Sequence, residues 1–159
     1  MPVKRTAILL ALGLLLAAKL CAATDVGRAT ARPGGLAVKP AQLAEVVNIA
    51  WCLQSMTRAK VRVDLVVGAK ITLTFQETGR VMGIASVNLY YGPFRLRQDG
   101  LIEWLEAFTT TRKGGPPILL KQEALYLETL ASTTHAYQAG ELLILENEDR
   151  ANGLKFSRC

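Results

Sequence analysis

A pair of half-buried strands is encoded in Lys70-Ile-Thr-Leu-Thr-Phe-Gln-Glu-Thr-Gly-Arg-Val-Met-Gly83. The first half of this stretch alternates apolar and polar side chains, which is the period of a strand with one buried face. A turn follows at residues 77–79, where Gly79 can adopt a positive φ at no steric cost. A return strand through Val81 then completes a β-hairpin.

Small residues occupy the inner face of the return strand. Gly83 and Ala85 leave space for a bulky neighbour, for which Trp51, Trp104 or a helix are candidates. Residues 88–92 then have the composition of a second turn. This hairpin and the turn after it predict antiparallel pairing in the middle of the chain.

Short strand patterns recur along the rest of the chain. The candidates are residues 51–53, 61–65, 93–96, 101–105, 108–111, 142–145 and 153–157. In residues 40–50 the apolar spacing is helical, whereas Val46 and Val47 favour a strand. A short helical turn that leads into a strand fits both signals. These patterns predict a mainly β domain.

One amphipathic helix, at about residues 118–133, interrupts the strands. Pro116 and Pro117 mark its first turn, where a missing N–H costs nothing. Its expected buried stripe is Leu120, Ala124, Leu127, Leu130 and Ala131. The expected solvent side carries Lys121, Gln122, Glu128 and Thr129. The chain therefore predicts an α+β fold in which one helix packs on a curled antiparallel sheet.

The first 23 residues have the features of an export signal. Lys4 and Arg5 precede the uncharged apolar run 6–18, and small residues lead to an expected cleavage site near Ala23. The run ends before the roughly 18 residues that a membrane span requires. We expect a periplasmic or secreted protein with no membrane span after cleavage. A membrane tether formed by an uncleaved signal is the alternative.

Two further segments complete the predicted organisation. Residues 24–39 are rich in Ala, Gly, Pro, Arg and Thr and predict a flexible linker. Residues 40–159 are then the folded domain. Cleavage removes Lys4, Arg5 and Lys19 and no acid, so the formal net charge falls from +6 to +3. The remaining bases are interspersed with acids and form no aromatic and basic platform, so we expect no nucleic acid partner.

Two of the three cysteines lie in the predicted mature chain, since Cys21 belongs to the signal. In an oxidising compartment Cys52 and Cys159 are candidates for a disulfide. The bond would close a loop of about 100 residues, which the chain-entropy model values at roughly 4.7 kcal/mol. In the alternative, Cys52 is a buried small hydrophobe beside Trp51 and Cys159 is a free terminal thiol.

Five motifs occur in a fixed order along the second half of the chain. They are Thr72-Leu-Thr-Phe75, Gly79-Arg-Val-Met-Gly83, Asn88-Leu-Tyr-Tyr-Gly92, Thr111-Arg-Lys-Gly-Gly-Pro-Pro117, and Glu123 with Leu127 and Leu130. Together they resemble the META domain of HslJ-like heat-inducible proteins of the bacterial envelope. The resemblance implies a partial barrel of lipocalin-like topology with one packed helix. Its signature positions here are Phe75, Gly79, Gly83, Asn88, Gly92, Thr111, Arg112, Pro117 and Glu123.

The chain departs from the family pattern at its cysteines. Many members carry an internal cysteine pair where this chain has Val87 and Gly114 or Gly115. Any function that depends on that pair is therefore not expected here.

Structural roles are expected for the polar signature residues. Asn88 is expected to cap a turn rather than bind a ligand, because Asn side chains bond nearby main-chain groups. Arg112 and Glu123 are expected to pair across the helix entrance, with Glu123 near the first turn. Of the adjacent Tyr90 and Tyr91, one ring is expected in the core and the other at the rim.

No catalytic constellation is visible in the sequence. His135 is the only histidine, and no known motif frames it with the nearby Ser132 and Glu128. One histidine and two distant cysteines do not make a metal site. We expect neither a cofactor nor enzymatic activity.

Three functions agree with these expectations. The first is a non-enzymatic exported protein that supports envelope integrity or stress tolerance. The second is an inhibitor or binding partner of envelope hydrolases, with the turn at residues 88–92 exposed. The third is a small-ligand binder that uses an apolar cavity in the mouth of the curled sheet.

Overall fold

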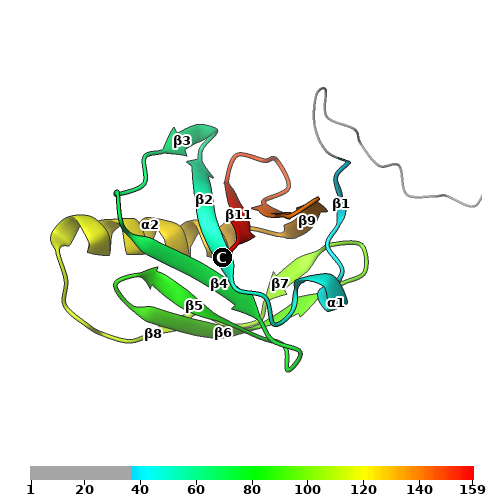
Figure 1. Ribbon diagram of the computed structural model, residues 1–159, viewed down its shortest axis with the longest axis horizontal. Helices are drawn as coiled ribbons and strands as arrows, with labels where there is room; N and C mark the ends of the chain where they lie inside the picture. Colours follow the sequence, from blue (N-terminus) through cyan, green and yellow to red (C-terminus); the bar gives the residue numbers. More distant parts are fainter. Residues whose placement is uncertain (1–36) are drawn as a thin grey trace, which may run out of the picture.

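A curled antiparallel sheet and one long helix are the main elements of residues 37–159, the part of the chain that the computed structural model describes (Figure 1). The strands are β1 (Lys39–Pro40), β2 (Trp51–Arg58), β3 (Val61–Val63), β4 (Lys70–Phe75), β5 (Arg80–Ser86), β6 (Leu89–Leu96), β7 (Ile102–Trp104), β8 (Thr109–Thr110), β9 (His135–Ala139), β10 (Leu142–Glu146) and β11 (Gly153–Arg158). The helices are the short α1 (Leu43–Val46) and the long α2 (Pro117–Ser132).

The strands follow the order β1-β9-β10-β11-β2-β4-β5-β6-β7, with β3 beside β2 and β8 beside β6. The sheet is not a closed barrel, but its two ends approach each other. There Leu101 bridges to His135, and the N–H of Ile102 donates to the carbonyl of Thr134 over 2.8 Å. The prediction of a curled antiparallel sheet with one packed helix is confirmed.

The β4–β5 hairpin forms where the sequence predicts it. Phe75 pairs with Val81, and Gly79 in the turn between the strands has a φ of 75°. The helical turn expected within residues 40–50 is α1, and β2 begins at Trp51. Local periodicity and turn chemistry were sufficient to predict both features.

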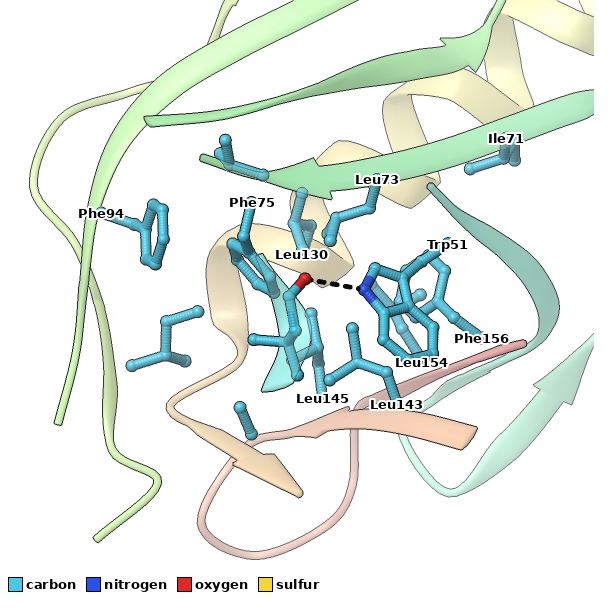
Figure 2. Packing of buried hydrophobic residues seen from close by; sticks show 14 of the residues in the cluster. Trp51, Ile71, Leu73, Phe75, Phe94, Leu130, Leu143, Leu145, Leu154 and Phe156 are labelled. Atoms are coloured by element: carbon cyan, nitrogen blue, oxygen red, sulfur yellow. Dashed lines mark hydrogen bonds between the residues drawn. The ribbon is translucent and has the colours of Figure 1, made fainter. Parts of the chain in front are cut away.

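The core lies between the inner face of the sheet and α2, which packs against β2, β5 and β11. Trp51, Phe75 and Phe156 are fully buried there with Leu130 of α2 (Figure 2). The indole N–H of Trp51 donates to the carbonyl of Val46 over 3.1 Å. The buried indole N–H is thus satisfied, as burial requires.

The predicted turn at residues 88–92 is wrong, because β6 already begins at Leu89. The turn is tighter and has Ser86 and Val87 at its centre, closed by the N–H of Ala85 to the carbonyl of Asn88 over 2.8 Å. In the strand that follows, Tyr90 is buried and Tyr91 is 44% exposed. This alternation places one tyrosine ring in the core and the other at the rim, as expected.

The predicted buried face of the helix is only partly right: Leu130 is buried and Leu127 packs against the core, but the centre of the face lies elsewhere. The buried residues of α2 are Gln122, Glu123, Tyr126, Thr129 and Leu130, whereas Ala124 and Ala131 are exposed. The observed buried residues also have helical spacing, but their face is rotated about the helix axis and includes polar side chains. Those side chains can be buried because each finds hydrogen-bond partners within the fold.

The predicted export signal, residues 1–23, lies outside the described residues. So does most of the predicted linker, although its last residue, Lys39, begins β1 and pairs with Gln138. Within residues 37–159 no helix combines the length and apolarity needed to cross a bilayer.

Candidate functional site

Three of the polar signature residues, Asn88, Thr111 and Glu123, meet where α2 crosses the β5–β6 turn. The side-chain oxygen of Asn88 accepts hydrogen bonds from the Thr111 hydroxyl (2.8 Å) and the Lys113 N–H (2.7 Å). Its amide nitrogen donates to Glu123 Oε1 (2.8 Å) and the Lys113 carbonyl (3.3 Å). An Asn side chain offers two donors and two acceptor sites, so Asn88 is saturated.

Glu123 completes this signature cluster of Asn88, Thr111 and Glu123. Its Oε2 accepts hydrogen bonds from the main-chain N–H groups of Asn88 (2.8 Å) and Val87 (3.2 Å). Glu123 is only 9% exposed. The carboxylate therefore holds the β5–β6 turn against α2 and satisfies two main-chain N–H groups of that turn.

The expected ion pair between Arg112 and Glu123 is absent from the described residues, where Arg112 is exposed and forms no ion pair. Glu123 also lies beyond the first turn of α2, which contains no acidic residue. The physical reason is that the groups around Arg112 have other partners. The Thr111 hydroxyl and the Lys113 main chain bond the Asn88 side chain, and the Glu123 carboxylate bonds Asn88 and Val87.

Gln122 is a structural residue that the sequence reasoning missed. Its side-chain oxygen accepts a hydrogen bond from the Val66 N–H (2.6 Å), and its side-chain amide nitrogen donates to the Ser86 hydroxyl (3.2 Å). Gln122 is 4% exposed. It therefore links the β3–β4 loop, α2 and the β5–β6 turn. Its helical spacing with Tyr126 and Thr129 was the available signal.

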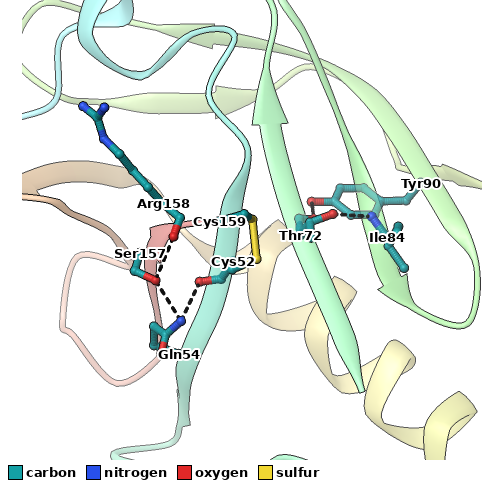
Figure 3. The surroundings of a disulfide bond; sticks show 8 residues. All are labelled: Cys52, Gln54, Thr72, Ile84, Tyr90, Ser157, Arg158 and Cys159. Atoms are coloured by element: carbon teal, nitrogen blue, oxygen red, sulfur yellow. Dashed lines mark hydrogen bonds between the residues drawn. A yellow bond between two sulfur atoms is a disulfide. The ribbon is translucent and has the colours of Figure 1, made fainter. Parts of the chain in front are cut away.

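A second buried group joins β4, β6 and α2. The Tyr90 hydroxyl donates to the carbonyl of Thr72 (3.0 Å; Figure 3), and it lies 2.7 Å from the Tyr126 hydroxyl. Because Tyr90 has one hydroxyl proton, Tyr126 must be the donor in the second bond. Burial raises the pKa of both tyrosines, so both are neutral at physiological pH.

Gly83 is required by the same tyrosine. A Cβ at this position would lie 2.0 Å from the Thr72 carbonyl oxygen and 2.8 Å from the Tyr90 ring. The bulky side chain next to Gly83 is thus Tyr90 rather than Trp51 or Trp104, and α2, the third candidate, packs against the same strand. Pairing at this point is irregular, and the Ile84 N–H donates to the Thr72 hydroxyl over 3.1 Å (Figure 3).

The remaining signature positions have structural places. Phe75 is in the core, and Gly79 forms the β4–β5 turn. A Cβ at Gly92 would lie 2.9 Å from the ring of Phe108. Pro117 is the first residue of α2.

Cys52 and Cys159 form a disulfide, with their Cα atoms 5.0 Å apart (Figure 3). The bond joins the start of β2 to the end of the chain. Beside it, the Gln54 amide donates to the Ser157 hydroxyl over 2.8 Å, and the Cys159 N–H donates to the carbonyl of Ala50. β2 and the C-terminal strand β11 are therefore held together by both covalent and hydrogen bonds.

His135 and Ser132 bond other groups and not each other, and the Ser132 hydroxyl also accepts a hydrogen bond from the Asn152 amide over 3.2 Å. Nδ1 of His135 lies 2.9 Å from the Thr134 hydroxyl, and its ring stacks on Tyr137. The Ser132 hydroxyl donates to the carbonyl of Thr129. In the described part of the chain, no group of three or more His, Cys, Asp or Glu residues is arranged to hold a metal ion.

The curled antiparallel sheet with one packed helix places the protein among small, mainly β domains. The model of the META domain family matches residues 42–158, and the chain belongs to this family. Among proteins with curated functions, none matches it significantly.

Solved structures share the fold. An NMR structure of a protein from Burkholderia xenovorans is 23% identical, with a TM-score of 0.64 over 82% of this chain and 93% of its own. A DUF4847 family protein from Bacteroides vulgatus is 10% identical, with a TM-score of 0.51 over 70% of this chain and 93% of its own. At these identities the likeness concerns the fold alone.

Proposed function

We propose that this META-domain protein is exported to the bacterial envelope and acts there by binding rather than by catalysis, in support of envelope integrity or stress tolerance. The observation that carries the proposal is the signature cluster. Asn88 and Glu123 are buried, and with the half-buried Thr111 they bond one another and nearby main-chain groups. They maintain the shape of the domain, and function then falls to the surface that this shape presents.

The disulfide supports the proposed compartment. Bonds such as Cys52–Cys159 persist in oxidising compartments and are rare in the cytosol. The basic and apolar composition of residues 1–23 agrees with the same route.

The filled interior favours binding at the surface over binding within the sheet. Trp51, Phe75 and Tyr126 occupy the space between the sheet and α2, and each is fully buried. A hydrolase inhibitor is less well supported, because residues 88–92 belong largely to β6 and do not form an exposed turn.

Export is tested by expressing the full chain with its own N-terminus and fractionating the cells. We expect the protein in the envelope or medium, with an intact mass that corresponds to cleavage near Ala23 and with both remaining thiols blocked to alkylation. An unprocessed cytosolic chain with free thiols would contradict the proposed export.

Binding without catalysis is tested on the same purified protein. We expect no turnover across a panel of ester, peptide and glycoside substrates. Hydrolysis that is lost in His135→Ala, while the variant keeps its fold, would contradict this part of the proposal.

A further inference from the structure

Three segments meet at the end of the molecule where α2 begins (Figure 1). They are the β3–β4 loop, the loop that precedes α2 and the first turns of α2 itself. A surface groove of about 220 Å³ separates the β3–β4 loop from the helix and is lined by Val66, Ile118 and Leu125. The buried Gln122 holds this loop to the helix. The β3–β4 loop therefore borders a groove and is held to α2 by a hydrogen bond from its main chain.

Apolar side chains project from this surface. Val67 is 99% exposed and Ile118 is 61% exposed. Val67 occupies the tip of a turn closed by the N–H of Ala69 to the carbonyl of Val66 over 3.1 Å. The next residue, Gly68, has the positive φ of 79° that a type II turn requires. A turn tip usually carries polar residues, so a fully exposed valine there calls for an explanation.

Basic side chains lie on the same three segments as these apolar groups, or directly beside them in the sequence. Lys70, Arg112, Lys113 and Lys121 are all exposed. None of the four forms an ion pair with a described residue. Six other bases do form such pairs: Lys39, Arg58, Arg95, Arg97, Arg150 and Arg158.

Acidic side chains do not balance this charge. Asp64 lines the groove and is the exposed acid found there. Glu123 is buried and committed to the β5–β6 turn. We call this region the basic end and define it by Lys70, Arg112, Lys113 and Lys121 together with Val67 and Ile118.

We propose that the basic end docks the protein on an anionic phospholipid bilayer. This inference rests on the binding role proposed above and names the partner. Lysine and arginine side chains bind lipid phosphates, whereas exposed aliphatic side chains enter the boundary between headgroups and acyl chains. Neither group alone gives firm attachment, but here both stand on one surface.

The composition favours a lipid surface over an acidic protein. Protein interfaces are enriched in aromatic residues and depleted in lysine. The basic end has three lysines and no aromatic residue among the six that define it. Val67 also projects outward, which suits insertion into a soft interface better than insertion into a preformed pocket.

The test is flotation of the exported, processed protein with vesicles at physiological ionic strength. Vesicles of phosphatidylcholine are compared with vesicles that contain roughly one third phosphatidylglycerol. We expect binding that depends on phosphatidylglycerol and weakens with added salt. Replacing Lys70, Lys113 and Lys121 together by Gln should lower the partition coefficient roughly a hundredfold. Val67→Ser with Ile118→Ser should lower it roughly tenfold.

Matched variants make the result specific. The charge control is Lys39→Gln, Arg95→Gln and Lys155→Gln, which removes the same charge from other exposed positions. The apolar control is Met82→Ser with Leu105→Ser. The native side chains at these two positions are 45% and 48% exposed. Both controls should bind like the unchanged protein, and circular dichroism should report the same fold for all variants.

Three outcomes would overturn the inference. The first is equal flotation with both kinds of vesicle. The second is an equal loss in the lysine variant and in its charge control. The third is binding to soluble poly-glutamate without binding to vesicles, which would assign the basic end to an acidic polypeptide. Export is measured separately by fractionation, so failure of lipid binding leaves that result intact.

Discussion

The carboxylate of Glu123 accepts two main-chain hydrogen bonds and one from the Asn88 amide. Glu123→Ala leaves these buried donors unpaired, and each costs about 1–3 kcal/mol. We therefore expect the free energy of unfolding to fall by about 3 kcal/mol or more, as measured by urea denaturation.

The matched control for Glu123 is Glu128, which lies on the exposed face of the same helix and pairs with Arg58. Glu128→Ala should cost no more than about 1 kcal/mol, because surface ion pairs contribute little. Equal losses in the two variants would show that the signature cluster does not have the structural role assigned to it.

The two buried tyrosines should respond unequally to loss of their hydroxyls. Tyr90→Phe leaves the Tyr126 proton and the Thr72 carbonyl without their partners, at a cost of about 1–3 kcal/mol. Tyr126→Phe leaves the Tyr90 donor bonded to Thr72 and should cost about 1 kcal/mol or less. Urea midpoints in the reverse order would contradict the assigned direction of the hydrogen bonds.

The same pair predicts a loss of stability in alkali. Burial raises the pKa of Tyr90 and Tyr126 in the folded state, whereas unfolded tyrosine ionises near about pH 10. Above that pH the unfolded chain binds fewer protons, so the free energy of unfolding falls as pH rises. The contribution of the two tyrosines to the free energy of unfolding is complete below about pH 10. It is lost as the pH rises towards their raised folded-state pKa.

Alkaline urea titrations check this pH dependence. The variant with Phe at both positions retains every lysine, so the titration of lysine affects both proteins alike. Its stability should fall less steeply with pH than that of the unchanged protein. Parallel curves would exclude the tyrosine pair as the cause.

At the scale of the elements, Gly83 determines how closely β4 and β5 approach under Tyr90. Gly83→Ala would place a methyl group 2.0 Å from the Thr72 carbonyl oxygen, so the strands would have to separate. We expect a loss of about 3 kcal/mol or more in the free energy of unfolding. Gly114→Ala is the control, since no atom lies within 4 Å of the added carbon. A Gly83→Ala protein as stable as this control would contradict the observed packing.

The hairpin could be predicted because its pattern is local, whereas the buried face of the helix could not because it depends on partners that are distant in the sequence. The alternation from Lys70 to Phe75 and the glycine turn are local patterns that need no partner. The buried side of α2 depends on Gln122 and Glu123, whose partners are the main-chain groups of Val66, Val87 and Asn88. Polarity alone placed Gln122 on the solvent side, because periodicity does not identify a distant hydrogen-bond partner.

The start of β6 shows a different limit. Asn88 and Gly92 are both turn-forming residues, and that local chemistry suggested a loop between them. The alternation of buried Tyr90 and Phe94 with exposed Tyr91 was a strand signal in the same stretch. Here the strand is favoured because the Tyr90 ring fills the space above Gly83. Asn88 keeps a structural role, but it binds Glu123 and the loop before α2 rather than capping a turn to Gly92.

At the scale of the whole molecule, the disulfide joins β2 to the last residue of the chain, across a separation of 107 positions. Replacing both cysteines by Ser should lower the free energy of unfolding by at most roughly 4.7 kcal/mol, because the cross-link restricts the unfolded chain. The domain should still fold, since pairing of β11 with β2 does not depend on the bond and a chain of this size buries a sufficient core. Reduction of the unchanged protein should shift its urea midpoint to that of the double variant, whose own midpoint should not respond to reductant. An unchanged midpoint after complete reduction would mean that the bond does not contribute to the stability of the domain.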